Sequence, residues 1–430
     1  MKNIPLLALI IFCAQSCSER KIDITHFEDY RPYLSSHRLV ENDPIQEEVA
    51  FWTKRLKQNK NDEASLVKLA ALHADLFKLT GLANHILLSD SLLKVVLKKY
   101  PGGNVEIYHQ LSANAISQHR FRESKSFAEE ALRLGDKKAT SLLQLVDASM
   151  EIGNYANANQ ILRNFKNKNS FAYLIRNAKL HDHNGRLDSA ITCMEKAYQR
   201  VKGNKSLAQW TLSNLGDMYG HAGDIKKSYE TYLEVLKHNP NDDYVLKGIA
   251  WIAISYDHNL KTAKAIINAL AERKRTPELQ LMLAEIAEME GNEFAKLQHL
   301  KKFKALVGQP EYKEMYHKYL VLLEAEEFNN AYAAAEIAKA EVLERPAPQS
   351  YDLLAWSYYH QRKFKDALDI AARKVENQTY EPEAIYHLAT IYKANGNTEK
   401  ARHYFTMALE SEFELGPSTA KKISAALEQL

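Results

Sequence analysis

The apolar residues of the chain recur at helical spacing, in paired stripes that a glycine-containing turn separates. Near the C-terminus the first stripe consists of Ile385, Leu388, Ala389 and Tyr392. This i, i+3, i+4, i+7 spacing places all four on one face of a helix. Ala401, Phe405 and Ala408 follow as a second stripe, and Gly396-Asn397 between them predicts a helix end, because a left-handed cap needs a residue that tolerates positive φ. The pattern predicts a helical hairpin.

The same pattern returns along almost the whole chain, at intervals of about 34 residues. Copies start at residues 108, 142, 174, 212, 246, 280, 315, 351 and 385. A longer copy starts at Leu66 and carries extra residues around Thr80-Gly81. The turn chemistry also returns, at Gly153-Asn154, Gly185-Arg186, Gly223-Asp224 and Gly291-Asn292. Since one hairpin cannot bury its own stripe, neighbouring hairpins must stack to form a shared core.

Period and turn chemistry together resemble the tetratricopeptide repeat, a helix–turn–helix unit. The resemblance covers residues 60–414 and is strongest in the copies at 212, 351 and 385. It implies an all-α solenoid of about ten tetratricopeptide-like hairpins that form a superhelix. We expect this array at residues 46–414, where Phe51, Trp52 and Leu56 suggest a helix covering its first unit. A capping helix is expected at 415–430, with Ile423, Ala426 and Leu427 on one face.

The N-terminal residues have the pattern of an export signal followed by a lipidation site. Lys2 precedes an apolar run, residues 6–12, that is too short to span a bilayer. Cys17 follows a small residue, as in a bacterial lipobox, although Ala14 replaces the usual leucine; simple secretion is the alternative. We expect a signal peptide at 1–16, a lipid on Cys17, and a tether at 17–45 with some docked aromatic residues. We therefore expect an outer-membrane lipoprotein of the bacterial cell envelope, facing either the periplasm or the cell surface.

Composition and motifs argue against several classes of function. The 57 basic and 54 acidic residues leave a formal charge of only +3, which gives no electrostatic reason to expect nucleic-acid binding. The sequence contains no glycine-rich phosphate loop, no G-x-S-x-G, no H-E-x-x-H and no C-x-x-C. We therefore expect neither catalysis nor a cofactor.

Three local features favour structural interpretations. His181 and His183 are two residues apart on a predicted helix and point in different directions, so we expect no metal there. Tyr256-Asp257-His258 is interpreted as a solvated polar loop. Cys193 is the one cysteine beyond the N-terminal region, and we expect a small buried side chain.

What remains is a second face on the first helix of each repeat, away from the buried stripe. In the tetratricopeptide family this face lines the concave groove that takes up peptides. Three of the four tryptophans fall on it, and Trp and Tyr contribute strongly to binding at interfaces. Partner recognition and packing against neighbouring repeats both stay open as explanations. The expected groove residues are Trp210, Asp217, His221, Tyr244, Lys247, Trp251, Tyr316, Trp356, Tyr359 and Tyr386.

The first hypothesis is thus a scaffold that holds a protein or peptide partner and attaches to the membrane through its lipid. Glycan or nutrient capture at the cell surface is the alternative, with aromatic platforms stacking on sugar rings. Such lipoproteins usually interrupt their arrays with long inserts, and no insert here exceeds about ten residues. A toroid-type hydrolase is the third hypothesis, but its hairpins run longer and no acid pair stands out.

Overall fold

The computed structural model describes residues 23–35, 44–99, 104–273 and 276–430. Within these ranges it contains 24 α-helices, a 3₁₀ turn at Lys313–Tyr316, a π turn at Leu323–Glu327 and no strand. Twenty of the helices pair into ten consecutive hairpins, each packed against the next. The prediction of an all-α solenoid of about ten hairpins is confirmed.

The first five hairpins are α3 (Glu63–Thr80) with α4 (Ala83–Lys99), α5 (Val105–Ser117) with α6 (Phe121–Leu134), α7 (Lys138–Glu151) with α8 (Tyr155–Asn164), α9 (Phe171–His183) with α10 (Leu187–Val201), and α11 (Lys205–His221) with α12 (Ile225–His238). The other five are α13 (Asp243–Ser255) with α14 (Leu260–Arg273), α15 (Glu278–Met289) with α16 (Glu293–Val307), α17 (His317–Leu322) with α18 (Ala331–Glu344), α19 (Pro348–His360) with α20 (Phe364–Lys374), and α21 (Pro382–Ala394) with α22 (Thr398–Leu409). We number these hairpins as repeats 1 to 10.

The turn inside most hairpins forms as the sequence predicts. Gly396 has φ +77°, and the side chain of Asn397 then accepts a hydrogen bond from the backbone N–H of Lys400. One dipeptide therefore ends the first helix and caps the second. Repeats 2, 6, 8 and 9 lack the glycine, and His119, His258, Asn329 and Arg362 take its left-handed conformation, with φ between 50° and 61°. The fold imposes this conformation there against the preference of the residue.

The N-terminal helix α1 (Phe27–Leu34) packs on the outside of the array, against α12 and α14. Tyr30 is completely buried there. Asp257 accepts hydrogen bonds from the backbone N–H groups of Ile24 and Thr25, both at 2.9 Å, and from the Thr25 hydroxyl at 2.6 Å. The solvated-loop interpretation of residues 256–258 was therefore wrong, because Asp257 fixes an incoming segment. Part of the predicted tether is docked on the array, while α2 (Pro44–Gln58) packs on α3.

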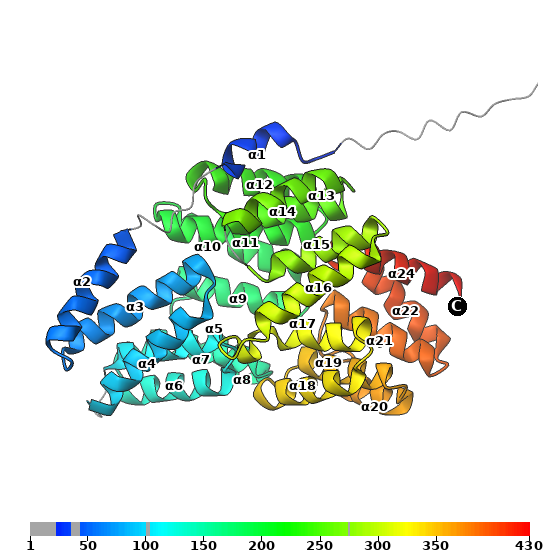
Figure 1. Ribbon diagram of the computed structural model, residues 1–430. Helices are drawn as coiled ribbons and strands as arrows, with labels where there is room; N and C mark the ends of the chain where they lie inside the picture. Colours follow the sequence, from blue (N-terminus) through cyan, green and yellow to red (C-terminus); the bar gives the residue numbers. More distant parts are fainter. Residues whose placement is uncertain (1–22, 36–43, 100–103, 274–275) are drawn as a thin grey trace, which may run out of the picture.

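The array coils so tightly that its late repeats lie against its early and middle ones (Figure 1). Arg345 pairs with Glu151 at 3.0 Å, which joins repeats 8 and 3. A Cβ on Gly185 would approach the Tyr380 ring to 2.8 Å, so repeats 4 and 10 also touch closely. At the C-terminus α23 (Glu412–Leu415) contacts α11, α13 and α21, and α24 (Pro417–Glu428) contacts α22 and α15. Ile423 is fully buried, and Ala426 and Leu427 pack beside it, as predicted.

Candidate functional site: the inner face of the coil

The first helix of each middle repeat lies on the inside of the coil, and the second helix lies on the outside. The two ends of the chain show this directly, since α1 packs on the second helices α12 and α14. The segment α23 packs instead on the first helices α11, α13 and α21. Nine of the ten predicted groove residues lie on first helices, namely α11, α13, α19 and α21, and Tyr316 lies in the 3₁₀ turn just before α17. Their surroundings differ from one repeat to the next.

An aromatic strip is exposed on the inner face of repeats 4 to 6. Trp210 is 45% exposed and Tyr244 is 49% exposed. Each lies two residues before the start of its repeat. Phe171 on α9 meets the Trp210 ring edge-on, with ring centroids 6.1 Å apart. We use the term aromatic strip for Phe171, Trp210 and Tyr244. Phe171 was missed from the sequence, although its place three residues before the repeat start at 174 offered a signal.

Tyr244 is held in one orientation by Asp217. The carboxylate of Asp217 accepts hydrogen bonds from the hydroxyls of both Tyr244 and Tyr232. Burial raises the pKa of Asp217, and the two hydroxyls oppose that rise. The Lys247 ammonium lies 5.7 Å from the centroid of the Tyr244 ring. Because Tyr244 is fixed while still half exposed, a partner could contact it with little loss of side-chain entropy.

Another part of the same face is covered by the C-terminal segment. The indole N–H of Trp251 donates a hydrogen bond to the backbone carbonyl of Phe413 at 3.0 Å. His221 Nδ1 lies 3.5 Å from a carboxylate oxygen of Glu414. Two predicted groove residues, Trp251 and His221, therefore contact the protein's own chain. The covering residues carried no signal in the sequence, because they lie where the repeat pattern breaks.

In repeats 8 to 10 the inner face is closed by its own side chains. Trp356 is only 3% exposed and stacks on Tyr359, with centroids 4.8 Å apart, and on His387, with centroids 4.0 Å apart. Its indole N–H donates to Glu326 at 2.8 Å. The ring centroid of the half-buried Tyr386 lies 6.0 Å from that of Trp356. For Trp356 the structure favours the packing alternative over direct contact with a partner.

Tyr316 is another predicted groove residue that the structure places inside. It is buried, and its hydroxyl donates to Glu278 at 2.8 Å. Its ring packs against that of Phe303, with centroids 5.8 Å apart. Packing explains Tyr316 as it explains Trp356.

Two ion pairs lie beside the Trp356 stack. His387 pairs with Asp352 at 2.8 Å, and both are buried. Burial alone would lower the pKa of His387, but the adjacent Asp352 carboxylate, together with Glu383 and Glu326, outweighs burial and raises that pKa. Lys318 pairs with Glu383 at 2.7 Å, and this ammonium lowers the pKa of Glu383 against the opposing effect of burial. Each charge meets an opposite one, so the arrangement satisfies the polar groups that the fold encloses.

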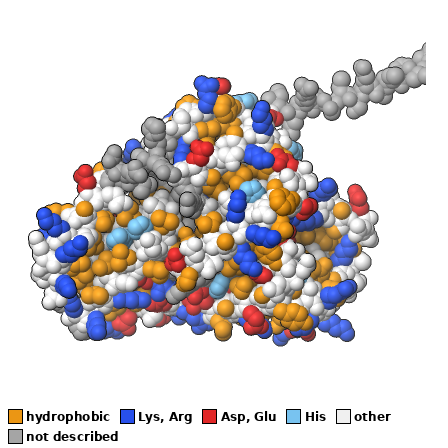
Figure 2. Space-filling model, viewed as in Figure 1, with side chains coloured by type: hydrophobic (Ala, Val, Ile, Leu, Met, Phe, Trp, Pro, Cys, Tyr) orange, Lys and Arg blue, Asp and Glu red, His pale blue; other side chains and the backbone are white. Residues whose placement is uncertain are grey.

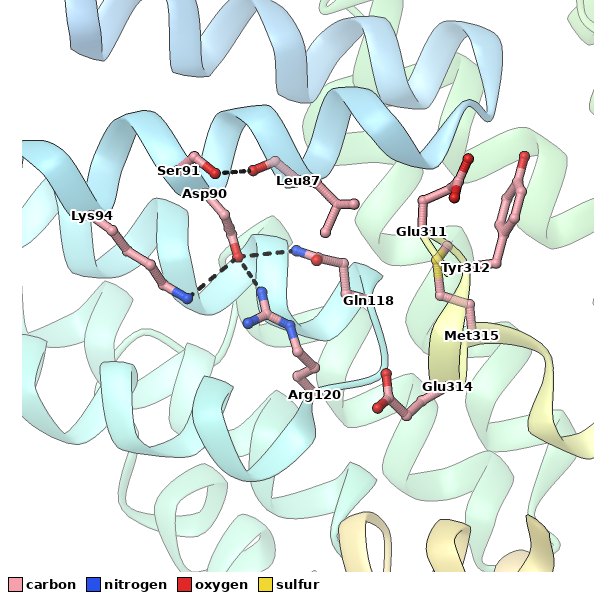
Figure 3. A pocket seen from close by; sticks show the side chains of 10 residues that line it. All are labelled: Leu87, Asp90, Ser91, Lys94, Gln118, Arg120, Glu311, Tyr312, Glu314 and Met315. Carbon is pink, nitrogen blue, oxygen red and sulfur yellow. Dashed lines mark hydrogen bonds and ion pairs between the residues drawn. The ribbon is translucent and has the colours of Figure 1, made fainter. Parts of the chain in front are cut away.

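A hollow of about 360 Å³ lies between α4, the turn after α5 and residues 311–315 (Figure 3). On one side Asp90 accepts hydrogen bonds from Gln118 and Arg120 and lies 3.9 Å from the Lys94 ammonium. Arg120 and Lys94 also pair with Glu123. Both cations are thus already neutralised by carboxylates, which argues against a phosphate site in this hollow.

A second hollow of about 370 Å³ separates repeats 4 and 5 from repeat 10 and α23. Its lining includes Asp182, His221, Glu381 and Glu414. Burial and the Glu381 carboxylate raise the pKa of Asp182, and burial is also the main cause of the raised pKa of Glu414. The nearby side chain of His221 opposes this rise in the pKa of Glu414. The C-terminal segment therefore docks with its carboxylate among like charges.

The remaining predictions concern metals, cysteines and the membrane. No group of three or more His, Cys, Asp or Glu side chains in the described residues is arranged to hold a metal ion. Within those residues, no helix combines the length and apolarity needed to cross a bilayer. Cys193 is buried, as predicted. The signal peptide and Cys17 lie outside the described residues.

On the surface seen in Figure 2, Lys and Arg side chains are interspersed with Asp and Glu side chains, and no single sign of charge dominates. This agrees with the nearly balanced composition.

Comparison with known proteins identifies the repeat. The family model described as "Tetratricopeptide repeat" matches residues 382–414, which form repeat 10 and the start of α23. The last hairpin therefore matches the tetratricopeptide repeat, and the nine hairpins before it have the same helix–turn–helix form. A search of curated proteins found no match to this chain. As an array of this kind it is a scaffold suited to protein or peptide binding, through the curved inner surface that stacked repeats create.

Solved structures resemble it only distantly. A tetratricopeptide repeat protein from Parabacteroides merdae is 18% identical, over 60% of this chain and 97% of that chain, with a TM-score of 0.35. The human IFIT1 dimer with PPP-AAAA is 14% identical, over 90% and 95% of the two chains, with a TM-score of 0.43. Yeast Tom70 is 12% identical, over 94% and 97%, with a TM-score of 0.35. No binding surface is transferred from them, because TM-scores this low do not superpose one groove on another.

Proposed function

We propose that this protein is a non-catalytic scaffold of the bacterial cell envelope, and that it holds a protein or peptide partner against the aromatic strip. The observation that carries the proposal is the exposure of Trp210 and Tyr244 on an inner face where Trp356 is packed and Trp251 is covered. Large amphipathic rings exposed side by side are the kind of residue that dominates binding at interfaces. Asp217 holds Tyr244 ready for contact.

The proposal includes export and attachment through a lipid on Cys17. Its support is the N-terminal sequence pattern, in which a basic residue and a short apolar run precede a small residue and then cysteine. Labelling cells with radioactive palmitate tests it, by comparing the natural protein with Cys17→Ala. We expect label on the natural protein and none on the variant. Absence of label from both would leave a secreted protein without an anchor.

The binding surface is tested by affinity capture from envelope fractions with the full chain, followed by mass spectrometry. For a captured partner, Trp210→Ala and Tyr244→Ala should each weaken binding by about 2 kcal/mol, or roughly thirtyfold, as expected for interface anchors. Phe294→Ala is the matched control, since Phe294 is 75% exposed on α16, a second helix, and should leave affinity unchanged. Equal affinity for all three variants would refute the strip as the partner surface. Capture of a glycan without protein would favour the alternative of glycan binding.

A further inference from the structure

The C-terminal segment occupies the inner face of repeats 5 to 7 in the manner of a bound peptide. We define the docked segment as residues 411–418, which connect α22 to α24 and include α23. It crosses the first helices α11 and α13 and reaches α15 where α24 begins. This is the face that the proposed function assigns to a partner, so the inference below rests on that proposed function.

Two glycines make the contact possible. A Cβ added to Gly220 on α11 would lie 2.7 Å from a ring carbon of Phe413, so the absence of a side chain there makes room for the phenyl ring. A Cβ added to Gly416 would lie 2.9 Å from the ring of Trp251. Gly416 also has φ 80° and ψ 162°, a conformation essentially confined to glycine. The surface and its occupant are thus matched at two positions three residues apart in the segment.

Polar contacts fix the direction of the docked segment. The indole of Trp251 donates to the Phe413 carbonyl, and His221 faces Glu414. Farther along, Glu285 on α15 lies at the first turn of α24, where contacts with Ser418 oppose the effect of burial on its pKa. A carboxylate at this place also interacts favourably with the N-terminus of the helix. The inner face thus contacts the ring and backbone carbonyl of Phe413 first, and the start of α24 farther along the segment.

The docked segment is held more weakly than the helix that follows it. No residue of α23 is buried, whereas α24 places Ile423, which is fully buried, among residues of the last repeats. A segment with few buried contacts opens locally at lower cost than the core around it. The segment can therefore leave the inner face while α24 stays on α22.

We propose that the inner face around Gly220 and Trp251 is a binding site for a short helical turn of another protein, with an aromatic residue followed three positions later by glycine. The docked segment fills this site from within the same chain until such a partner displaces it. Because the occupant is tethered at both ends, its effective concentration is high, and a free peptide must compete against it. The partner must therefore supply what the docked segment supplies, an aromatic ring against Gly220 and a residue without a side chain against Trp251.

The test uses the full chain and a fluorescent synthetic peptide with the sequence of residues 411–418. In the double variant Phe413→Ala/Gly416→Ala the chain's own segment loses both matched contacts, so the site opens. We expect this variant to bind the peptide at least tenfold more tightly than the natural protein does. Leu427→Ala is the matched control, because Leu427 lies in α24, outside the docked segment, and packs on the last repeats, so its loss should leave peptide binding unchanged. Adding Trp251→Ala to the double variant should abolish binding.

A folded double variant that binds the peptide no better than the natural protein does would overturn the proposal. Equally tight binding of a peptide whose Phe413 is replaced by Ala would also overturn it. Should the double variant fail to fold, hydrogen exchange on the natural protein tests whether the docked segment opens on its own. Amides of residues 412–416 should exchange well before those of α22 and α24, and exchange only on global unfolding would refute the proposal. Neither experiment uses the aromatic strip or a captured partner, so failure here leaves the test of the proposed function intact.

Discussion

Two tryptophans at the same place in their repeats have different neighbours. Trp251 and Trp356 each lie five residues after the start of a repeat, at 246 and 351, and each donates its indole N–H within the protein. The acceptor of Trp356 is Glu326, on the preceding repeat, and its ring is buried between neighbouring side chains. The acceptor of Trp251 is the carbonyl of Phe413, far away in the sequence and in α23, none of whose residues is buried. The first contact belongs to the core, and the second can be exchanged for a partner.

This contrast shows what repeat position alone can reveal. Position decides that a side chain lies on the inner face. The neighbouring repeats and the path of the chain decide whether anything covers it. In repeats 8 to 10 the next repeat supplies His387 and Tyr386 to cover the ring. In repeats 5 and 6 the next repeat supplies no such cover, and the docked segment or solvent takes its place.

The largest expected effect concerns stability. Trp356→Ala should lower the local stability of repeats 8 to 10 by about 3–5 kcal/mol, because a buried indole leaves a cavity and an unpaired Glu326. Trp210→Ala should change stability by only about 1 kcal/mol, since Trp210 is already 45% exposed. Urea titration with hydrogen exchange on α19 and α21 measures both. Similar losses in the two variants would contradict the division into packed and open regions.

A second prediction concerns pH and the buried pair in the packed region. The pKa of His387 is raised in the folded protein, so its contribution is complete below the ordinary histidine value of 6.5 and is lost as pH rises through the folded pKa. Protection of α21 amides should therefore fall as pH increases above 6.5. His387→Gln removes this dependence if the pair causes it, and the imidazole resonances of His387 report the titration directly. An unchanged profile in His387→Gln would assign the effect to another group.

The sequence predicted the fold well because period and turn chemistry are local. Gly396-Asn397 ends one helix and starts the next with no help from distant residues, and the apolar stripe fixes which face is buried. It predicted the inner face for the same reason. It could not predict which of those residues stay accessible, because that depends on the coiling that brings Phe413 to Trp251 across 162 positions. Asp257 illustrates the same limit, since its partners lie more than 230 positions away.

The smallest expected effect concerns the carboxylates around the docked segment. Glu414 faces Asp182 and Glu381, its pKa is raised mainly by burial, and the His221 and Lys318 side chains oppose that rise. Release of the segment would return Glu414 to its ordinary pKa of 4.5. The docked state therefore binds the proton more tightly, and docking gains stability as pH falls through the raised pKa towards 4.5.

At neutral pH, Glu414→Gln should stabilise docking by about 0.2–1 kcal/mol, the range of partly exposed charge interactions. Hydrogen exchange at residues 412–416 should then be slower and less dependent on pH than in the natural protein. Glu410→Gln, in the same hollow, is the control and should not slow it. Faster exchange in Glu414→Gln would show that the pairing with His221 outweighs burial and the neighbouring carboxylates.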